Sequence, residues 1–328
     1  MRAVALPSVG QAASPPLVGG AIYWLHLAGR WLARVLPLRL SYALAARGGA
    51  LVYYLWASKR RHAVANFRQI LGPQRAHLAP RLARASFANY GRYLVDMLRL
   101  SGRECRALDG RLVVDGLEHI AAAFARGRGL IMVGAHLGNS DLGGALFAAR
   151  GYPVHVIAER LHPPRWNALV QATRRDCGLQ VLETTAPPRE ILRVLRRNEV
   201  LCLLVDRPLH HDGSGVPVRF FGAPTRVPAG AATLALRTGA ALLAACMVRV
   251  GDGFRLEVRP VREVARSGDR AADIQQLTQH VMDALAEFIR RYPEQWFMFR
   301  PMWPAGHRAA SCRSDSDPLA ASQALTPA

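Results

Sequence analysis

His136 and Asp141 are the residues of this chain whose types and spacing best suit acid–base chemistry. The apolar run 129–135 before them predicts a buried strand, and the residues after them predict a helix, so both side chains fall in a turn where α/β proteins place reactive groups. Asn139 or Ser140 can cap that helix, which puts Asp141 in its first turn. We predict that Asp141 reaches back to the imidazole and that His136 acts as a general base. The alternative is an ordinary capped helix with a histidine beside it.

After about residue 109 the chain alternates between strand and helix patterns. Seven apolar runs predict strands, several of them apolar throughout, as expected for strands covered on both faces: 112–114, 129–135, 154–158, 179–182, 200–205, 241–248 and 254–258. Helical patterns lie between them at 141–149, 165–177, 188–197, 228–238 and 271–291. This alternation predicts an α/β fold, with a mixed, largely parallel sheet flanked by helices.

The composition narrows the class of protein. Of the 328 residues, 51% are hydrophobic and 20% are charged, so the chain can bury a core and is not a disordered protein. It lacks a run of about 18 uncharged apolar residues, which argues against a polytopic membrane protein. The net charge is +20, and residues 1–110 hold 16 basic and 3 acidic side chains. So much positive charge indicates contact with an anionic membrane surface or with nucleic acid.

Residues 17–57 are apolar but interrupted by arginines and rich in tyrosine and tryptophan, a composition typical of helices that lie in a membrane interface. The basic cluster 58–62 that follows suits anionic headgroups. The alternative is a helical subdomain packed on the rest of the protein. We expect four regions along the chain: a disordered leader at 1–15, a helical membrane-associated section at 16–108, an α/β domain at 109–305 and a disordered tail at 306–328.

Other chemistries have little support in the sequence. The five cysteines are scattered, without C-x-x-C spacing, so a disulfide framework is not predicted and a reducing compartment is the simplest interpretation. The run His210-His211-Asp212 lacks a further ligand at a useful spacing, and we expect no metal. The motifs of phosphate-binding loops, zinc proteases and dinucleotide-binding folds are missing. Nucleic-acid binding would rest on charge alone, and it is not expected.

The block around His136 and Asp141 resembles the HxxxxD/E block of bacterial glycerolipid and lipid A acyltransferases. Three further groups of residues resemble that family in the same order: 166–178 its helix ending R-x-x-x-G, 203–207 and 215–230 its aspartate and F-F-G blocks, and 291–300 its closing P-x-Q-W segment. The resemblance covers about residues 20–304 and is specific as a set. It points to the late lipid A acyltransferases and the related phosphatidylinositol mannoside acyltransferases.

This resemblance implies a membrane-associated O-acyltransferase at the cytoplasmic face of the plasma (inner) membrane. A glycolipid hydroxyl would attack an acyl thioester carried by acyl carrier protein or coenzyme A, with no cofactor. The acceptor we expect is a lipid A-type precursor, and a phosphatidylinositol mannoside or another glycolipid is the alternative. A membrane-apposed N-terminal section is usual in the family and fits the basic, aromatic first third. The alternative from a different class is a non-catalytic membrane-binding protein on the same fold.

The resemblance also implies roles for individual residues. His136 matches the general base and Asp141 the carboxylate that supports it, whereas Arg174 and Asp206 match positions associated with activity. Many lipid A enzymes read D-x-D at the aspartate block, but here Arg207 and then a proline follow Asp206. A role for a second carboxylate is therefore not carried over.

Five side chains are candidates for substrate binding. Arg174 or Arg207 can stabilise the negative charge that develops on the thioester carbonyl, or bind a phosphate of the lipid or of the pantetheine arm. Glu159 and Arg160 follow a predicted strand and are expected to line the site. Asp206 ends another strand and is expected there too. The ordinary alternatives are a solvated helix face for the arginines and a helix cap or an arginine partner for Asp206.

Overall fold

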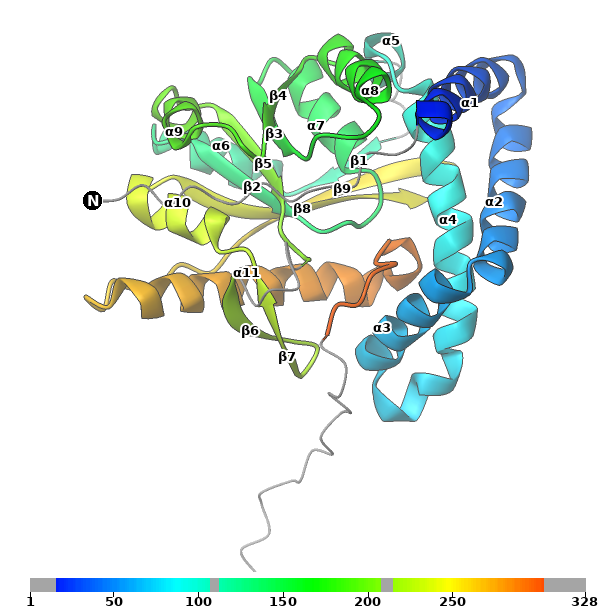
Figure 1. Cartoon of the computed structure of the whole chain (residues 1–328). Helices are drawn as coiled ribbons and strands as arrows, with labels where there is room; N and C mark the ends of the chain where they lie inside the picture. The colour runs from blue at the N-terminus through cyan, green and yellow to red at the C-terminus, as the bar shows by residue number, and fades with distance from the viewer. Residues whose placement is uncertain (1–15, 107–111, 208–214, 304–328) are drawn as a thin grey trace, which may run out of the picture.

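We describe the protein from a computed structural model (Figure 1). The described residues are 16–106, 112–207 and 215–303. The leader and tail expected at 1–15 and 306–328 lie outside them, as does the run His210-His211-Asp212. Within the described residues the fold is α/β, a mostly parallel sheet flanked by helices with a helical N-terminal region beside it. The predicted fold class is therefore confirmed.

Seven strands form the central sheet, and each corresponds to one predicted run: β1 (Leu112–Asp115), β2 (Leu130–Gly134), β3 (Val154–Ala158), β4 (Leu179–Glu183), β5 (Val200–Leu204), β8 (Ala241–Val250) and β9 (Gly253–Pro260). The strand order is β1-β9-β8-β2-β5-β3-β4. Neighbouring strands of this sheet run parallel, except that β8 and β9 are antiparallel. The C-terminal ends of β8, β2, β5, β3 and β4 therefore lie at one edge, where α/β folds place their sites.

The central strands are apolar on both sides, so each face of the sheet carries its own core. In β2, Ile131 and Val133 belong to one core, whereas Leu130 and Met132 belong to the other. Helices that contribute to the first core are α9 (Pro188–Arg196), α10 (Gly230–Thr238) and α11 (Arg270–Arg291). The second core includes α6 (Leu117–Ala125) and α7 (Ser140–Ala149), and α8 (Pro164–Asp176) connects β3 to β4.

The sequence patterns do not predict α6 or the antiparallel hairpin of β6 (Val216–Phe220) and β7 (Ala223–Val227). Both hairpin strands contain a proline, which weakens a strand signal. The hairpin packs on α11, where the Arg219 backbone N–H donates to Gln279 Oε1 (2.7 Å). Phe220 is buried in the first core.

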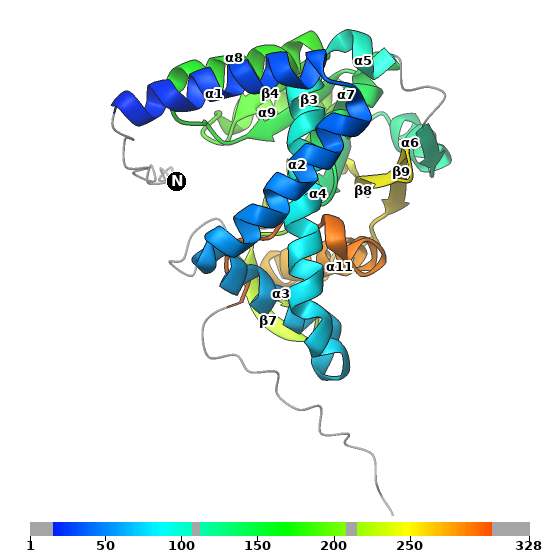
Figure 2. The ribbon, with the colours of Figure 1, turned by 90° about the vertical axis from the view of Figure 1, so that its right-hand side faces the viewer.

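The N-terminal region contains α1 (Pro16–Val35), α2 (Leu38–Leu55), α3 (Ala57–Arg75), the short 3₁₀ helix η1 (Ala76–Leu78), α4 (Ala79–Arg99) and α5 (Gly102–Arg106). Figure 2 shows α1 along α8 and α2 crossing α4. Arg30 Nη1 donates to Thr173 Oγ1 (2.9 Å) and Trp166 Nε1 donates to His26 Nδ1 (3.3 Å), which ties α1 to α8. In the described part of the chain, the apolar stretches of the helices are too short to cross a membrane.

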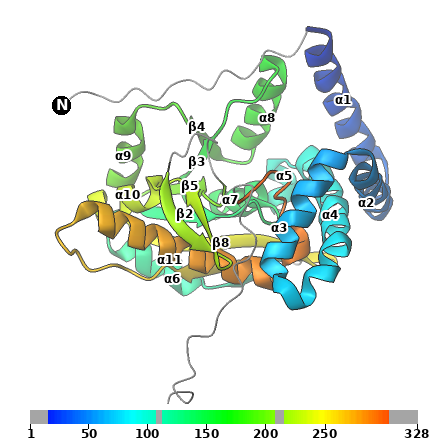
Figure 3. The same cartoon turned by 60° about the horizontal axis from the view of Figure 1, so that its bottom comes forward.

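α3 and α4 stand at one end of the sheet and share its first core (Figure 3). Phe67 of α3 and Phe87 of α4 are buried in that core. Asn66 of α3 donates from Nδ2 to the carbonyl oxygens of Met298 (2.9 Å) and Arg300 (2.8 Å). These two helices are therefore packed onto the sheet, and they also fix the course of the segment after α11.

Glycines lie where α2 and α4 touch. A Cβ atom at Gly49 would lie 2.1 Å from the carbonyl oxygen of Phe87, and one at Gly91 would lie 2.1 Å from that of Ala45. Any side chain at either position would push the two helices apart. Their close approach therefore depends on both glycines.

Large hydrophobic side chains are exposed mainly on α1 and α2. Of the eighteen such side chains in the described residues, twelve lie between Trp24 and Trp56. Exposed fractions reach 74% for Leu55, 71% for Leu25 and 67% for Trp24. So many exposed apolar groups on two adjacent helices indicate an interaction surface rather than ordinary solvated helices.

Candidate active site

β2 and β5 bring His136 and Asp206 together. The two strands are parallel neighbours, with Gly134 opposite Leu204 in the register. His136 comes two residues after Gly134, and Asp206 comes two residues after Leu204. Equal offsets from paired residues place the two side chains side by side at the C-terminal edge of the sheet.

His136 and Asp206 form two hydrogen bonds with each other. His136 Nδ1 lies 2.6 Å from Asp206 Oδ1, and the His136 backbone N–H donates to Oδ2 (3.0 Å). A third donor, Trp296 Nε1, lies 2.9 Å from the same Oδ2. The Asp206 side chain is fully buried, whereas 27% of the His136 side chain is exposed. The imidazole is therefore reachable from outside, and its carboxylate partner is not.

The environment of Asp206 keeps it ionised. Burial alone would raise the pKa of this carboxyl, but the charge of His136 and the hydrogen bonds from His136 and Trp296 outweigh burial and lower the pKa. An ionised Asp206 accepts a hydrogen bond from the N–H at Nδ1 of the imidazole. This hydrogen bond leaves Nε2 as the ring nitrogen that can take part in proton transfer.

The predicted contact between Asp141 and His136 is wrong, because Asp141 binds Arg174 instead. Asn139 caps α7 by accepting from the Leu142 N–H (3.0 Å), as expected, and Asp141 lies in the first turn. Its carboxylate faces α8, where Arg174 Nε lies 2.7 Å from Oδ1 and Arg174 Nη2 lies 3.3 Å from Oδ2. Burial lowers the pKa of Arg174, but the Asp141 carboxylate outweighs this effect and raises it. The two predicted site residues thus form a buried, bidentate pair that links α7 to α8.

The turn that carries His136 is held from two sides. Its Gly138 N–H donates to the carbonyl of Gln295 (3.0 Å) in the 3₁₀ helix η3 (Pro293–Gln295), and the Phe297 N–H donates to the carbonyl of His136 (2.8 Å). Gly138 has a positive φ of 64°, and a Cβ there would lie 1.9 Å from the carbonyl oxygen of Met247 in β8. Only glycine fits this position.

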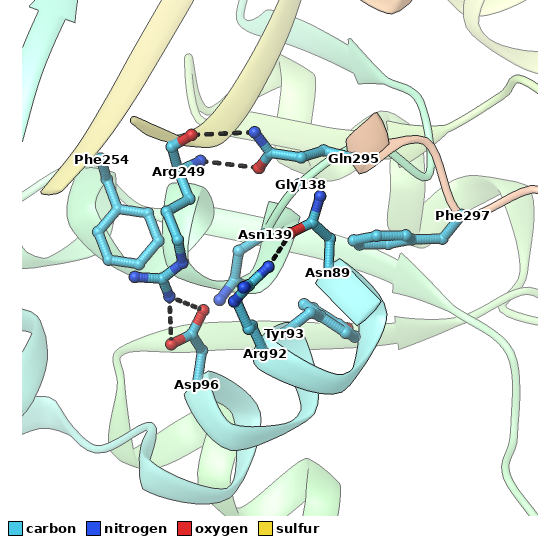
Figure 4. A pocket seen from close by; sticks show the side chains of 10 residues that line it. All are labelled: Asn89, Arg92, Tyr93, Asp96, Gly138, Asn139, Arg249, Phe254, Gln295 and Phe297. Atoms are coloured by element: carbon cyan, nitrogen blue, oxygen red, sulfur yellow. Dashed lines mark hydrogen bonds and ion pairs between the residues drawn. The ribbon is translucent and has the colours of Figure 1, made fainter. Parts of the chain in front are cut away.

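A small polar pocket lies beside the same turn (Figure 4). On one side of it, Arg249 Nη2 binds the Asp96 carboxylate of α4 (2.7 Å to Oδ1), and Gln295 exchanges two hydrogen bonds of 2.9 Å with the Arg249 backbone. Arg249 also stacks on Tyr42 of α2, whose ring centroid lies 4.2 Å from the guanidinium carbon. This cluster attaches α2 and α4 to β8 and to the segment that holds His136.

An apolar groove of about 600 Å³ opens beside His136. The groove is bounded by α2, α4 and the segment 297–300, and Arg207 lines it as His136 does. Its walls are mostly aliphatic and aromatic side chains together with glycines: Ala45, Gly48, Gly49, Val52, Trp56, Phe87, Tyr90, Gly91, Leu94, Val95, Leu98, Phe297, Met298 and Phe299. A volume of this size is in the range of about 300–1,000 Å³ that is typical of ligand sites.

The remaining predicted residues occupy the neighbouring strand ends. Arg207 forms an ion pair with Glu159, which links the ends of β5 and β3 next to the groove. Arg160 pairs with Glu183 of β4 (3.0 Å), is 65% exposed and does not line the groove. In the described ranges, groups of three or more His, Cys, Asp or Glu side chains that could hold a metal ion do not occur.

Trp296 and the groove are the parts of the site that the sequence patterns do not predict. Trp296 is fully buried, and its aromatic surroundings favour a core position, so only its hydrogen bond to Asp206 reveals a second role. Its place in the P-x-Q-W segment is the one available signal. The groove combines residues far apart in the chain, such as Gly48 and Phe297, and no local pattern brings them together.

The comparisons with known proteins all point to acyltransferases of one family. The family model of the bacterial lipid A biosynthesis acyltransferases matches residues 16–304. The chain is 35% identical to the phosphatidylinositol mannoside acyltransferase of Mycobacterium tuberculosis, over 86% of this chain and 88% of that protein. It is 33% identical to the enzyme of the same name from Mycolicibacterium smegmatis, over 88% and 93% of the two chains. It is 26% identical to the lipid A biosynthesis palmitoleoyltransferase of Escherichia coli, over 83% and 88%.

The Asp141–Arg174 pair predicts a specific pattern of stability. Asp141→Asn or Arg174→Met alone should lower the free energy of unfolding by about 3–5 kcal/mol, because each leaves a buried charge without its partner. The double variant should cost less than the sum of the two, and denaturant unfolding of all four proteins measures this difference. As a control, Glu183→Gln breaks an exposed pair and should cost about 1 kcal/mol or less. Strictly additive costs would show that the two side chains do not interact.

Proposed function

The chain belongs to the bacterial lipid A biosynthesis acyltransferase family, and from this premise we propose that it moves a fatty acyl chain from a thioester to a hydroxyl of a membrane glycolipid. The acyl donor is a thioester of acyl carrier protein or of coenzyme A. One observation carries the proposal: the partly exposed imidazole of His136, held by buried Asp206, stands at an apolar groove that can accept a hydrocarbon chain.

His136 acts as the general base of this transfer. Its Nε2 takes the proton of the acceptor hydroxyl as the hydroxyl oxygen attacks the thioester carbonyl. An ester C–O bond forms, the C–S bond breaks, and the imidazolium returns the proton to the departing thiolate. Asp206 positions the ring, keeps the proton on Nδ1 and stabilises the imidazolium while it exists.

The groove holds the acyl chain, and Arg207 acts on the carbonyl end. Most of the groove lining is apolar, which favours a hydrocarbon chain over a sugar. Arg207 lines the groove together with His136, so its guanidinium is available to stabilise the charge that develops on the thioester carbonyl. Glu159 orients Arg207 through their ion pair.

The acceptor we propose is a mannosylated phosphatidylinositol rather than a lipid A precursor. The chain is 35% and 33% identical to two enzymes named for the inositol mannoside, against 26% to an enzyme named for lipid A. These identities support the inositol mannoside, which the sequence analysis gives as the alternative to a lipid A-type precursor. The acceptor assay below therefore includes both glycolipids.

We also propose that the protein works on the cytoplasmic face of the plasma membrane. The exposed apolar side chains of α1 and α2, next to exposed arginines, suit a helix pair that lies in the interface of an anionic bilayer. Val52 and Trp56 are exposed and also line the groove, so that surface is continuous with the acyl site. A lipid acceptor can therefore reach His136 from the bilayer.

Substitutions in the site should separate the roles of the two aspartates. His136→Ala should lower acyl transfer by about 10²–10⁴-fold, because it removes the proton acceptor. Asp206→Asn should cause a loss of similar order in kcat, because the imidazolium loses its charged partner. Asp141→Asn, which does not touch His136, should retain a larger kcat wherever the protein remains folded. The assay follows labelled acyl chains from each thioester to the mannosylated inositol lipid and to a lipid A precursor.

Circular dichroism and a thermal melt of each variant provide the control for folding. A folded His136→Ala protein that transfers at the wild-type rate would contradict the proposed function. An Asp141→Asn protein with lower kcat than Asp206→Asn would return the supporting role to Asp141.

The groove predicts that Gly48 limits acyl-chain length. Gly48 lines the groove, and a Cβ atom there would meet nothing within 4 Å, so a larger side chain would project into open space. Gly48→Met should lower kcat/KM for a palmitoyl thioester by roughly tenfold or more and leave a short acyl thioester less affected. Gly20→Met is the matched control, because Gly20 is also helical and also meets nothing within 4 Å, but does not line the groove. Equal loss for both chain lengths would place the acyl chain elsewhere.

The exposed apolar side chains of α1 predict membrane binding. Replacing Trp24, Leu25 and Trp31 by serine should reduce flotation with anionic liposomes at least tenfold, since each apolar side chain buried in the bilayer contributes roughly 2 kcal/mol. The control exchanges exposed hydrophobic residues outside the N-terminal helices, Val113 and Leu117, for serine and should float like the wild type. If both variants float alike, α1 is not the membrane-binding element.

A further inference from the structure

Cationic side chains lie on the wall of the groove. The groove is lined by Lys59, Arg207 and Arg300 as well as by its apolar residues. Glu159 neutralises Arg207, whereas among the described residues neither Lys59 nor Arg300 forms an ion pair with a carboxylate. The groove therefore carries two uncompensated positive charges on a wall that is otherwise apolar.

Both of these side chains line the same groove. Lys59 lies in the first turn of α3, with its Nζ 5.7 Å from the ring centroid of Trp56, and it is half-buried. Burial and the repulsion by Arg300 both lower the pKa of Lys59. Asn66 fixes the backbone of Arg300 by a hydrogen bond to its carbonyl oxygen (2.8 Å). Two like charges that the fold places together in a partly apolar site are stabilised when an anion binds between them.

We propose that Lys59 and Arg300 form a phosphate-binding site in the wall of the acyl groove. This inference rests on the proposed function, because that reaction brings two phosphate-bearing molecules to the groove. The pantetheine arm of a carrier protein or coenzyme A thioester contains a phosphate, and so does the headgroup of a phosphatidylinositol glycolipid. Guanidinium and ammonium groups are the side chains that bind phosphate oxygens most strongly.

A phosphate held at this site would set the position of its substrate relative to His136. The same groove contains the imidazole, the apolar walls and the cationic pair, so one molecule can contact all three. Lys59 and Arg300 are thus binding residues, distinct from the proton transfer at His136. Their loss should weaken the affinity for a phosphate-bearing substrate.

The test measures binding without turnover. The full chain and the double variant Lys59→Ala/Arg300→Ala are titrated by calorimetry with 4′-phosphopantetheine, which carries the arm phosphate, and with glycerophosphoinositol, which carries the lipid phosphodiester. Pantetheine and inositol serve as the matching probes without phosphate. The double variant should bind at least one phosphate probe about tenfold more weakly, the change expected for a lost charge-assisted hydrogen bond, and should bind the phosphate-free probes unchanged.

A matched control removes two charges elsewhere. Arg81→Ala/Arg84→Ala deletes two exposed arginines of α4 that do not line the groove, so it lowers the net charge equally and should leave binding unchanged. Lys59→Arg should retain binding, because it keeps a cation at the site.

Each outcome of the titrations has a defined meaning. Weaker binding of 4′-phosphopantetheine alone supports the site and assigns it to the donor. Weaker binding of glycerophosphoinositol alone supports it and assigns it to the acceptor, and weaker binding of both supports a site that accepts either. If neither probe weakens more than in the control variant, the proposal is overturned. A protein that shows the expected binding and yet transfers no acyl chain would refute the proposed function alone.

Discussion

The buried carboxylate of Asp206 is the constraint on which the candidate site depends. A fully buried carboxylate is tolerated only when hydrogen-bond donors and a positive partner surround it. Here the donors come from two separate segments, His136 after β2 and Trp296 after η3. Both segments are held in turn, since Phe297 binds the carbonyl of His136 and Gly138 lies against β8. The orientation of one imidazole is thus fixed by the meeting of three parts of the chain at one sheet edge.

A second charge pair, Asp141 with Arg174, helps to connect the His136 turn to the N-terminal helices. Asp141 lies in the first turn of α7, next to the turn that carries His136, and its bidentate contact with Arg174 fixes α8. One residue before Arg174, Thr173 accepts a hydrogen bond from Arg30 of α1. On the opposite side, Asp96 and Arg249 attach α4 to β8. The helices that carry the exposed apolar surface are therefore anchored to the same turn that presents His136, which fixes the distance between that surface and the imidazole.

The sequence predicts the strands of the main sheet, the turn with His136, and Asp206 as a site residue, because each leaves a local signal. It does not predict which carboxylate supports His136. His136 and Asp141 are five residues apart, and this short spacing suggests that they pair. In the structure, however, the first turn of α7 directs Asp141 toward α8. Asp206 reaches His136 because β2 pairs with β5, and the local spacing of residues does not predict this strand order. Trp296 is missed for a related reason, since a fully buried indole looks like core until its N–H partner is known. The sequence does not predict the groove, because its walls come from α2, α4 and the segment 297–300, which are far apart in the chain.

α2 connects the exposed apolar surface to the groove beside His136. Gly49 lets it approach α4 without a gap, whereas Gly48, one residue earlier, leaves the groove open. Further along the same helix and just after it, Val52 and Trp56 line the groove and are also exposed to the outside. Under the proposed function, a hydrocarbon chain passes from a bilayer interface into the groove along continuous apolar surface, and no step of its transfer requires that chain to be surrounded by water. Exposure of the chain to water would cost about 0.8 kcal/mol of free energy for each methylene group. For a long acyl chain the total cost would exceed the binding free energy that a few polar contacts provide. A groove that begins at the exposed apolar face avoids this cost. This is a physical reason for α2 to form part of the exposed apolar surface and part of the groove wall.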